Sequence, residues 1–289
     1  MWCGPEGSQF IEATTAPHHL CRCSDGEFVE EAVATPVRIR PEHGGLDVNM
    51  ETMPDIPDVD RILQEQMRYY RERAAEYDHW FLRMGRYDHG EAATRDWFEQ
   101  VGQVRAALAA VPLDGAKVLE LAPGTGIWTA ELGSRAEHVT AVDASAEMIQ
   151  LNRRRLGADA AKVTYVEADL FDWQAEETYD VVVFCFWISH IPEARLDWFL
   201  AKVAAMTRPG GSVFFLDGRR EPTSTATDHS LRANDVGLMV RRLEDGREFT
   251  IVKNFWNARD LESRCARAGL DVKVNETRDY FQYGIGHRL

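Results

Sequence analysis

The sequence predicts an α/β fold in which a mostly parallel sheet of seven strands lies between two layers of helices. Two observations carry this prediction. From residue 116 to the end, short apolar runs alternate with stretches of helical periodicity, which is typical of parallel strands joined by crossover helices. Before that point, residues 58–115 carry only helical periodicity and turn residues, which predicts an N-terminal helical cap.

The individual elements follow from the same periodicities. In the cap, Ile62, Leu63, Met67 and Tyr70 recur at spacings of three and four, as on one face of a helix. Cap helices are expected at residues 59–84 and 91–110. Strands are expected at residues 117–121, 138–143, 163–167, 179–186, 212–216, 247–255 and 271–283, with helices at 126–134, 145–156, 194–206 and 260–268. Ser145 stands where it would cap its helix.

Two segments lack such periodicity. Residues 1–57 are rich in Pro, Gly, Thr and acidic residues, which predicts a flexible extension. Alternatively, this stretch is not native, and Met50 or Met53 is the true start. Residues 218–245 form a long insertion within the expected domain of residues 116–289. Its place at the carboxyl end of the sheet predicts a lid or a wall of a substrate site.

Composition narrows the functional classes. Acidic residues outnumber Lys and Arg by 47 to 33 and the net charge is −14, which disfavours a nucleic-acid partner because phosphate binding needs basic patches. No apolar run is long enough to cross a membrane, and no secretory signal is apparent. We therefore expect no membrane partner and a cytoplasmic protein. The residues Cys3, His18, His19, Cys21 and Cys23 lack a zinc-site spacing, so no metal is predicted.

The segment from Val118 to Gly126 carries the functional prediction. A buried strand enters a turn containing Gly124 and Gly126, and a helix begins at once, so backbone N–H groups face a ligand at close range. Asp143 ends the next strand, where an acid can accept both ribose hydroxyls. This geometry suits any ligand that contains adenosine.

Details of the turn separate the adenosine ligands. A dinucleotide fingerprint needs a third glycine, but Thr129 occupies that position, which disfavours a nicotinamide oxidoreductase. The Gly-Lys-Ser/Thr of a phosphate-binding loop is absent too. Glu120 would repel a pyrophosphate, and instead suits a ligand that carries an ammonium and a sulfonium group.

At this point the chain resembles the class I, Rossmann-like methyltransferases that use S-adenosylmethionine. The matching pieces are Glu120–Gly126, Asp143, Glu167–Phe171, Tyr179–Asp180, Arg208–Gly211 and the helix Tyr69–Asp78. The resemblance spans about residues 69–283. It implies a three-layer sandwich whose last strand is antiparallel, S-adenosylmethionine as cofactor, and methyl transfer. Ala122 stands where the family often has Gly.

The resemblance also implies roles for individual residues. Glu120, Gly124 and Gly126 would lie near the methionine part, and Asp143 would hold the ribose. Around the adenine would lie Ala144, Met148, Asp169 and the Leu170 backbone, with Phe186 closing the far side and Tyr77 reaching the methionine carboxylate. Alternatives stay open: a solvated acid for Glu120, a helix cap for Asp143, a turn for Asp169 and core packing for Tyr77.

The acceptor and the base are less determined. Candidate bases are His190 after the fourth strand, His229 in the insertion and Asp217 at the end of the fifth strand. Their alternatives are a structural His, a surface His and an ion pair with Arg219 or Arg220. The stretch Cys185–Ser189 lacks the Asp/Asn-Pro-Pro-Tyr/Phe motif of enzymes that methylate DNA bases or Gln amides. An aromatic wall suits a small molecule instead.

The leading hypothesis is therefore methyl transfer to an O or N atom of a small-molecule acceptor. Three alternatives remain: a non-methylating enzyme that cyclises or cleaves S-adenosylmethionine, a methyltransferase acting on a macromolecule, and a non-catalytic protein that binds an adenosine ligand. The sequence leaves a homodimer open.

Overall fold

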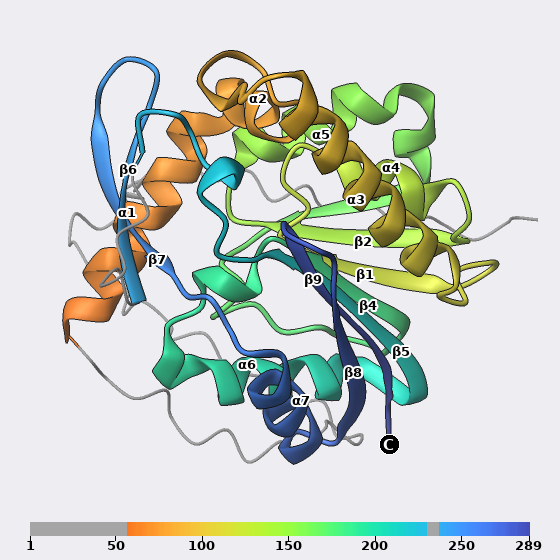
Figure 1. Cartoon of the computed structure of the whole chain (residues 1–289). Helices are drawn as coiled ribbons and strands as arrows, with labels where there is room; N and C mark the ends of the chain where they lie inside the picture. Colours follow the sequence, from red (N-terminus) through yellow and green to blue (C-terminus); the bar gives the residue numbers. More distant parts are fainter. Residues whose placement is uncertain (1–56, 230–236) are drawn as a thin grey trace, which may run out of the picture. The chain divides into compact units, whose positions relative to one another are not determined.

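The computed structural model describes residues 57–229 and 237–289. Their centre is a seven-stranded sheet with strand order β3-β2-β1-β4-β5-β9-β8 (Figure 1). Strand β9 runs antiparallel to both of its neighbours, and the pairs among β1 to β5 are parallel. This confirms the predicted fold class. The predicted extension of residues 1–57 lies, apart from Pro57, outside the described residues.

The strands of this sheet are β1 (Lys117–Leu121), β2 (His138–Asp143), β3 (Val163–Glu167), β4 (Tyr179–Cys185), β5 (Thr207–Gly218), β8 (Leu270–Glu276) and β9 (Phe281–Arg288). The helices are α1 (Pro57–Arg73), α2 (Tyr77–Phe81), α3 (Glu91–Ala109), α4 (Ile127–Gly133), α5 (Ala146–Leu156), α6 (Glu193–Met206) and α7 (Ala258–Arg267). Ser145 caps α5 as predicted, because its Oγ accepts the Met148 N–H at 3.2 Å.

Each face of the sheet is covered by helices. Helices α3, α4 and α5 cover one face, and α6 and α7 cover the other (Figure 1). Alternate residues of β1 show this division: Val118 packs on the first face and Leu119 on the second, and both are fully buried. Strands buried on both faces read as continuous apolar runs, which is why the sequence marks them clearly.

The cap helix is shorter than predicted. The expectation of one helix over residues 59–84 is wrong, since α1 ends at Arg73 and a 3₁₀ turn, Ala74–Glu76, separates it from α2. No glycine or proline marks this break. The change of direction brings Tyr77 over the turn after β1, where its ring lies 4.0 Å from the position a Cβ of Gly124 would take.

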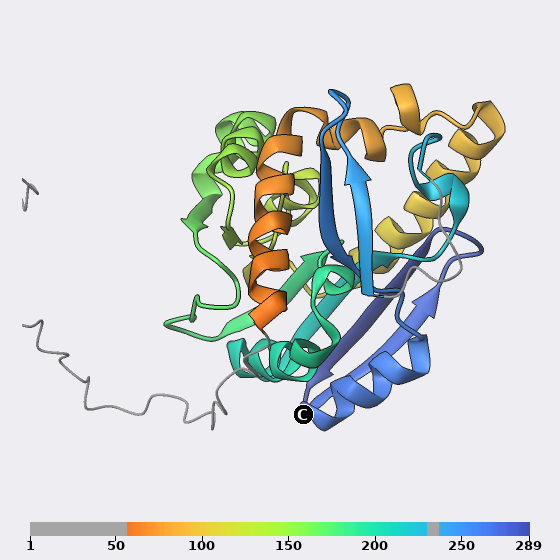
Figure 2. The same ribbon diagram turned by 90° about the vertical axis from the view of Figure 1, so that its left-hand side faces the viewer.

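The C-terminal strands also differ from expectation. The strand predicted at residues 247–255 exists as β7 (Glu248–Lys253), but it pairs with β6 (Gly237–Arg242) in a separate two-stranded sheet beside α1 (Figure 2). The strand predicted at residues 271–283 is instead the hairpin β8–β9. Gln100 of α3 stabilises the turn of this hairpin, because its Oε1 accepts from the Thr277 hydroxyl and from the N–H groups of Asp279 and Tyr280. Sequence periodicity does not reveal such long-range partners.

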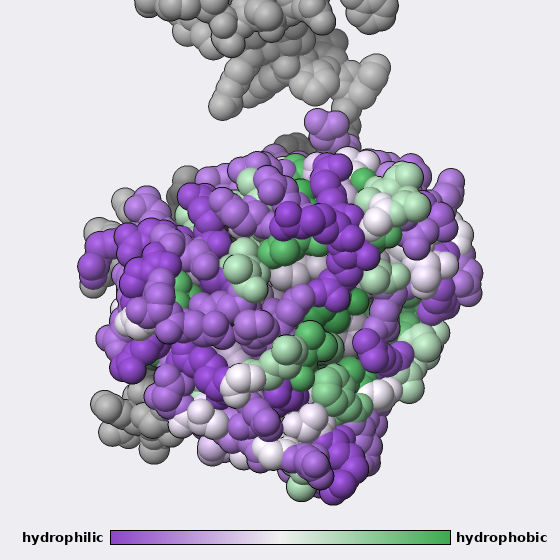
Figure 3. Space-filling model, turned by 90° about the horizontal axis from the view of Figure 1, so that it is seen from above, coloured by the Kyte–Doolittle hydropathy of each residue, from purple (hydrophilic) through white to green (hydrophobic). Residues whose placement is uncertain are grey.

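The surface seen from above is mainly hydrophilic, with hydrophobic residues gathered in a narrower central band (Figure 3). None of the helices in the described ranges is both long and apolar enough to cross a membrane. Within residues 57–229 and 237–289, no cluster of three His, Cys, Asp or Glu side chains could hold a metal ion. The predicted absence of a site at Cys3–Cys23 concerns residues outside these ranges.

Candidate active site

The turn between β1 and α4 forms the floor of the site. Gly124 and Gly126 have φ angles of +55° and +87°, and Ala122 has +53°. This left-handed region is costly for residues with a Cβ, which explains why glycine would be expected at residue 122. A Cβ on Gly126 would lie 2.6 Å from the Asn152 amide. Gly126 is therefore required by packing against α5.

The carboxylate of Asp143, at the end of β2, stabilises this turn through hydrogen bonds to backbone N–H groups. One carboxylate oxygen accepts the Gly124 N–H at 3.1 Å, and the other accepts the Ser145 N–H at 2.9 Å. Burial raises the pKa of Asp143 to about 6, although these backbone donors oppose the shift. The carboxylate is thereby fixed between the ends of two neighbouring strands.

A cleft of about 770 Å³, including its open part, lies over the carboxyl ends of the strands. We call it the sheet-end cleft. It is lined by eight of the ten residues predicted to bind the cofactor: Tyr77, Gly124, Asp143, Ala144, Met148, Asp169, Leu170 and Phe186. Helix α1 supplies Leu63, Gln66, Met67 and Tyr70 as a cover. Sequence reasoning missed this cover.

Glu120 and Gly126 are not among the residues that line the sheet-end cleft. Glu120 is 1% exposed, and its Oε2 has no hydrogen-bond partner among the described residues. Burial raises the pKa of Glu120 to about 8, against a hydrogen bond with Thr129 that lowers it. Glu120 is thus a buried carboxyl group beside the turn, with one unpaired oxygen and no place in the wall of the cleft.

The other residues predicted around the adenine are held in place by contacts within the protein or by the backbone conformation. Asp169 Oδ1 accepts the Phe171 N–H at 2.9 Å, so it also makes a turn. The Leu170 carbonyl accepts from Lys202 Nζ at 2.8 Å. Phe186 has a φ of +57°, a strained conformation at the end of β4 and of the kind found at functional sites.

A second cleft, of about 730 Å³ with its open part, lies beside the first. We call it the cap cleft. Its walls come from α1, α2, the insertion, the β6–β7 hairpin and the turn before β9; they include Tyr69, Arg73, Trp80, Tyr87, Arg219, Thr225, His229, Arg241, Lys253 and Tyr280. Tyr70, Tyr77, Phe186 and His190 line both clefts.

His190 stands in the wall between the clefts. Its Nδ1 lies 2.7 Å from the Val252 carbonyl, which assigns the proton to Nδ1. Its Nε2 can then accept from the Tyr70 hydroxyl, also at 2.7 Å. Burial and the nearby Lys253 ammonium hold the pKa of His190 well below its usual value. His190 is therefore neutral, with Tyr70 as its hydrogen-bond donor.

Asp217 is fully buried at the end of β5 and is not among the residues lining the cap cleft. It accepts the Ser189 N–H at 2.9 Å and the Gly218 N–H at 2.7 Å, and it pairs with Lys253 Nζ at 3.3 Å. Its partner is thus Lys253, and the expected alternative of Arg219 is wrong because Arg219 pairs with Glu276 at 3.3 Å.

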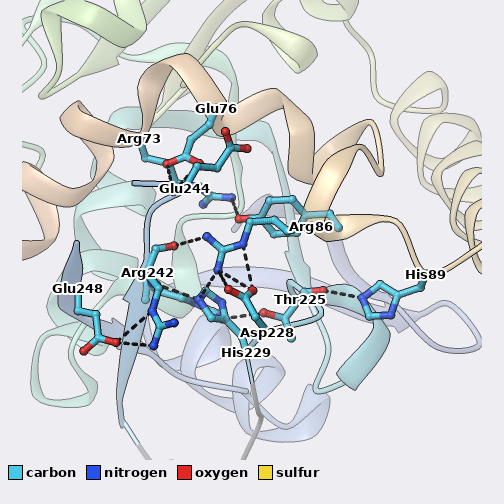
Figure 4. Close-up of polar contacts among 12 residues, drawn as sticks. Arg73, Glu76, Arg86, His89, Thr225, Asp228, His229, Arg242, Glu244 and Glu248 are labelled. Carbon is cyan, nitrogen blue, oxygen red and sulfur yellow. Dashed lines mark hydrogen bonds and ion pairs between the residues drawn. The ribbon is translucent and has the colours of Figure 1, made fainter. Parts of the chain in front are cut away.

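His229 lines the cap cleft among arginines (Figure 4). Its Nε2 accepts the Arg242 N–H at 3.1 Å and lies 3.0 Å from Arg86. Burial and the charges of Arg241 and Arg86 lower the pKa of His229 to about 4. Arg86 also binds Asp228 and the Arg242 carbonyl, so it joins the insertion to the β6–β7 hairpin.

Gln66 links the cover to the turn after β4 and to β7. Its side chain is 2% exposed, donates to the His190 carbonyl at 3.1 Å and accepts the Val252 N–H at 3.0 Å. Helix α1 is thus attached to the wall between the clefts and to β7. The sequence analysis matched the helix Tyr69–Asp78 to the family and gave a role to Tyr77. It gave none to Gln66, Tyr70 or Arg73, although Tyr70, Arg73 and Tyr77 recur at helical spacing.

The comparisons with known proteins agree with this geometry. A family model for the methyltransferase domain matches residues 118–211. A solved complex of DhpI with SAH is 33% identical, with a TM-score of 0.62, over 78% of this chain and 97% of that chain. The chain belongs to the class I S-adenosylmethionine-dependent methyltransferases. The predicted family is thereby confirmed.

A second DhpI structure, a DhpI–SAM–HEP complex, is 32% identical with a TM-score of 0.63, over 78% of this chain and 97% of that chain. The curated relatives match over shorter stretches. Demethylmenaquinone methyltransferase of Clavibacter sepedonicus is 31% identical over 43% of this chain and 50% of the relative. Ubiquinone biosynthesis O-methyltransferase of Vibrio parahaemolyticus is 32% identical over 36% of this chain and 44% of the relative. The chain matches about half the length of these curated relatives.

Proposed function

We propose that this methyltransferase transfers a methyl group from S-adenosylmethionine in the sheet-end cleft to an O or N atom of a small molecule in the cap cleft. The observation that carries the proposal is the wall that both clefts share. Since Tyr70, Tyr77, Phe186 and His190 line both, ligands in the two clefts would meet at these residues. In-line transfer needs donor and acceptor to be held in contact.

The residues of the sheet-end cleft fit this cofactor. Asp143 offers a fixed carboxylate to a ribose, and the left-handed turn at Gly124 lets a ligand approach the backbone. Asp169 and Leu170 line the same cleft and would offer polar and apolar partners to an adenine. When bound, S-adenosylmethionine supplies an electrophilic methyl group and its own leaving group.

The chain's own residues would orient the acceptor and exclude water. Trp80 packs against Phe186 at 4.8 Å between ring centroids, so an aromatic pair lies beside the place where the two clefts meet. Of the three predicted bases, His190 alone lines both clefts. Because its Nε2 accepts from Tyr70, His190 would meet an acceptor only through the Tyr70 hydroxyl, and its lowered pKa makes it a weak base that serves mainly to orient that hydroxyl. His229 and Asp217 instead support arginine and lysine side chains.

The test is to incubate the purified chain with S-adenosylmethionine and a library of small acceptors, and to identify the products by mass spectrometry. Acceptor-dependent S-adenosylhomocysteine together with a methylated small molecule would support the proposal. Production of 5′-methylthioadenosine instead would refute methyl transfer. Methyl label found only in added protein or RNA would refute the small-molecule acceptor, and binding without turnover of any acceptor would indicate a non-catalytic role.

A further inference from the structure

The cap cleft has a charge opposite to that of the whole chain. Four cationic side chains line it, those of Arg73, Arg219, Arg241 and Lys253, and no Asp or Glu of the described residues does. Two of these side chains form ion pairs with carboxylates that do not line the cleft: Lys253 pairs with Asp217, and Arg219 pairs with Glu276. In a chain with a net charge of −14, this concentration of positive charge is local.

Arg73 and Arg241 have no such balance. Within the part of the chain that the structure describes, neither guanidinium lies within ion-pair distance of a carboxylate. Arg73 is 9% exposed, and its Nε has no hydrogen-bond partner among the described residues. Its neighbours are aromatic: the ring of Tyr77 lies 4.9 Å away and that of Tyr69 5.6 Å away. Burying a charge with so little compensation is costly.

These cations also repel one another. Burial lowers the pKa of Arg241, and the like charge of Arg73 acts in the same direction. Burial lowers the pKa of Lys253 as well, and Arg241 adds to this effect against the attraction of Asp217. The three side chains come from α1, β6 and β7, so the fold brings them together from distant parts of the chain. A bound anion would relieve the repulsion.

We propose that the acceptor carries a compact oxyanion group, a carboxylate or a tetrahedral phospho group, bound in the cap cleft by Arg73, Arg241 and Lys253. This inference rests on the proposed function and deepens it by naming the class of acceptor. Guanidinium groups bind both kinds of oxyanion through paired, charge-assisted hydrogen bonds.

The remaining walls fit the same ligand. Burial raises the pKa values of Tyr69 and Tyr77, so their hydroxyls stay protonated and can donate. Arg241 is oriented from one side by a hydrogen bond of 2.7 Å to Thr225 Oγ1. The cleft therefore offers donors and positive charge together, with an aromatic surface for the rest of a small molecule.

The test is calorimetry on the whole chain saturated with S-adenosylhomocysteine, with methylphosphonate, acetate and the neutral acetamide as probes. We expect the anions to bind and acetamide not to bind. Tighter binding of methylphosphonate would identify a phospho group, and tighter binding of acetate a carboxylate. If acetamide binds as well as acetate, or if neither anion binds, the inference is overturned.

A matched pair of variants locates the anion. Arg241→Gln should weaken binding of the preferred anion by about 10–100-fold, as expected for losing charged hydrogen bonds. Arg242→Gln removes the same charge from the next residue, which is exposed and pairs with Glu248 at 2.8 Å outside the cleft, and should leave binding unchanged. Equal effects of the two variants would overturn the inference. Unchanged S-adenosylhomocysteine affinity shows that each variant is folded.

Failure of this inference and failure of the proposed function give different results. If anions bind through Arg241 but no small molecule is methylated, the anion site is supported and the proposed reaction is refuted. If neutral acceptors are methylated and the anions neither bind nor inhibit, the proposed reaction is supported and the anion site is refuted. Methylation confined to acceptors that carry an oxyanion supports both.

Discussion

The two clefts of this methyltransferase meet at one wall but are built in different ways. The sheet-end cleft is formed largely by turns after neighbouring parallel strands, and Asp143 fixes it through backbone N–H groups. The cap cleft joins segments separated by up to about 200 residues, and side chains such as Arg86, Asp217 and Gln66 hold these segments together. A site formed by strand ends is determined by the strands themselves and the turns that follow them. A site formed by side-chain contacts depends instead on how distant segments pack together.

The two clefts also differ in charge. Asp143 and Asp169 line the sheet-end cleft, whereas arginines and lysine line the cap cleft. A cationic cofactor next to a negatively charged acceptor would match this pattern on both sides. Four predictions test the comparison.

The largest effect is expected from Asp217→Asn. Asp217 is a buried ion-pair partner of Lys253 and accepts two backbone N–H groups, and losing such a charge costs about 3 kcal/mol of unfolding free energy. Urea denaturation would measure this loss. Asp114→Asn, which breaks the ion pair of an exposed carboxylate with Arg135, is the control and should change stability little. Equal stability of the two variants would refute the structural role.

Asp143→Ala should change cofactor affinity strongly and stability little, which is the opposite of a mainly structural role. Cofactor affinity should fall about 10–100-fold, since charge-assisted hydrogen bonds to the ribose are lost. The unfolding free energy should change by about 1 kcal/mol or less, because the lost hydrogen bonds are offset by removing a buried carboxylate. Calorimetry and denaturation on the same variant separate the two quantities. Unchanged affinity would break the assignment of the sheet-end cleft.

Cofactor affinity should also depend on pH. If Asp143 holds the ribose as proposed, its ionised form would accept the ribose hydroxyls, and its pKa is raised to about 6 by burial. Affinity is therefore complete above this pKa and is lost as the pH falls through it, by about tenfold between pH 7 and pH 5. Glu120, with a pKa of about 8, and His229, with one of about 4, keep their neutral forms over this range.

The control for this pH dependence is Asp143→Asn, whose cofactor affinity should be weaker and independent of pH between pH 7 and pH 5. A flat profile in the unaltered chain, measured by calorimetry, would show that Asp143 is not the group that titrates.

The smallest effect is expected from Arg86→Ala. Arg86 does not line the cap cleft but binds both Asp228 of the insertion and the Arg242 carbonyl of β6 (Figure 4). Its loss should raise the KM for the acceptor about fivefold through a less ordered insertion, with kcat and cofactor affinity nearly unchanged. Arg86→Lys should restore part of the effect. A matching loss of cofactor affinity would contradict the separation of the two clefts.

The sequence allowed prediction of the sheet-end cleft because its residues follow strand ends in order. Eight of ten predicted residues line it, and the roles assigned to them stay predictions. For the cap cleft, the sequence predicted an aromatic lining, the insertion as a wall, and His190 and His229 as candidate bases, but it did not predict the cationic side chains. In the sequence, Arg73, Arg241 and Lys253 are ordinary polar positions on a helix and two strands. The pairing of β6 with β7 decides where Arg241 and Lys253 point. Periodicity identifies a strand, but it does not identify the neighbouring strand.

The Gln66 amide has a consequence for how ligands enter. Helix α1 covers the sheet-end cleft and carries Tyr70 and Arg73 into the cap cleft, while Gln66 binds the His190 carbonyl and Val252 N–H. A movement of α1 that releases the cofactor would break both bonds and dismantle the acceptor site. The two ligands should therefore bind with positive cooperativity, and each should raise the affinity for the other by the same factor.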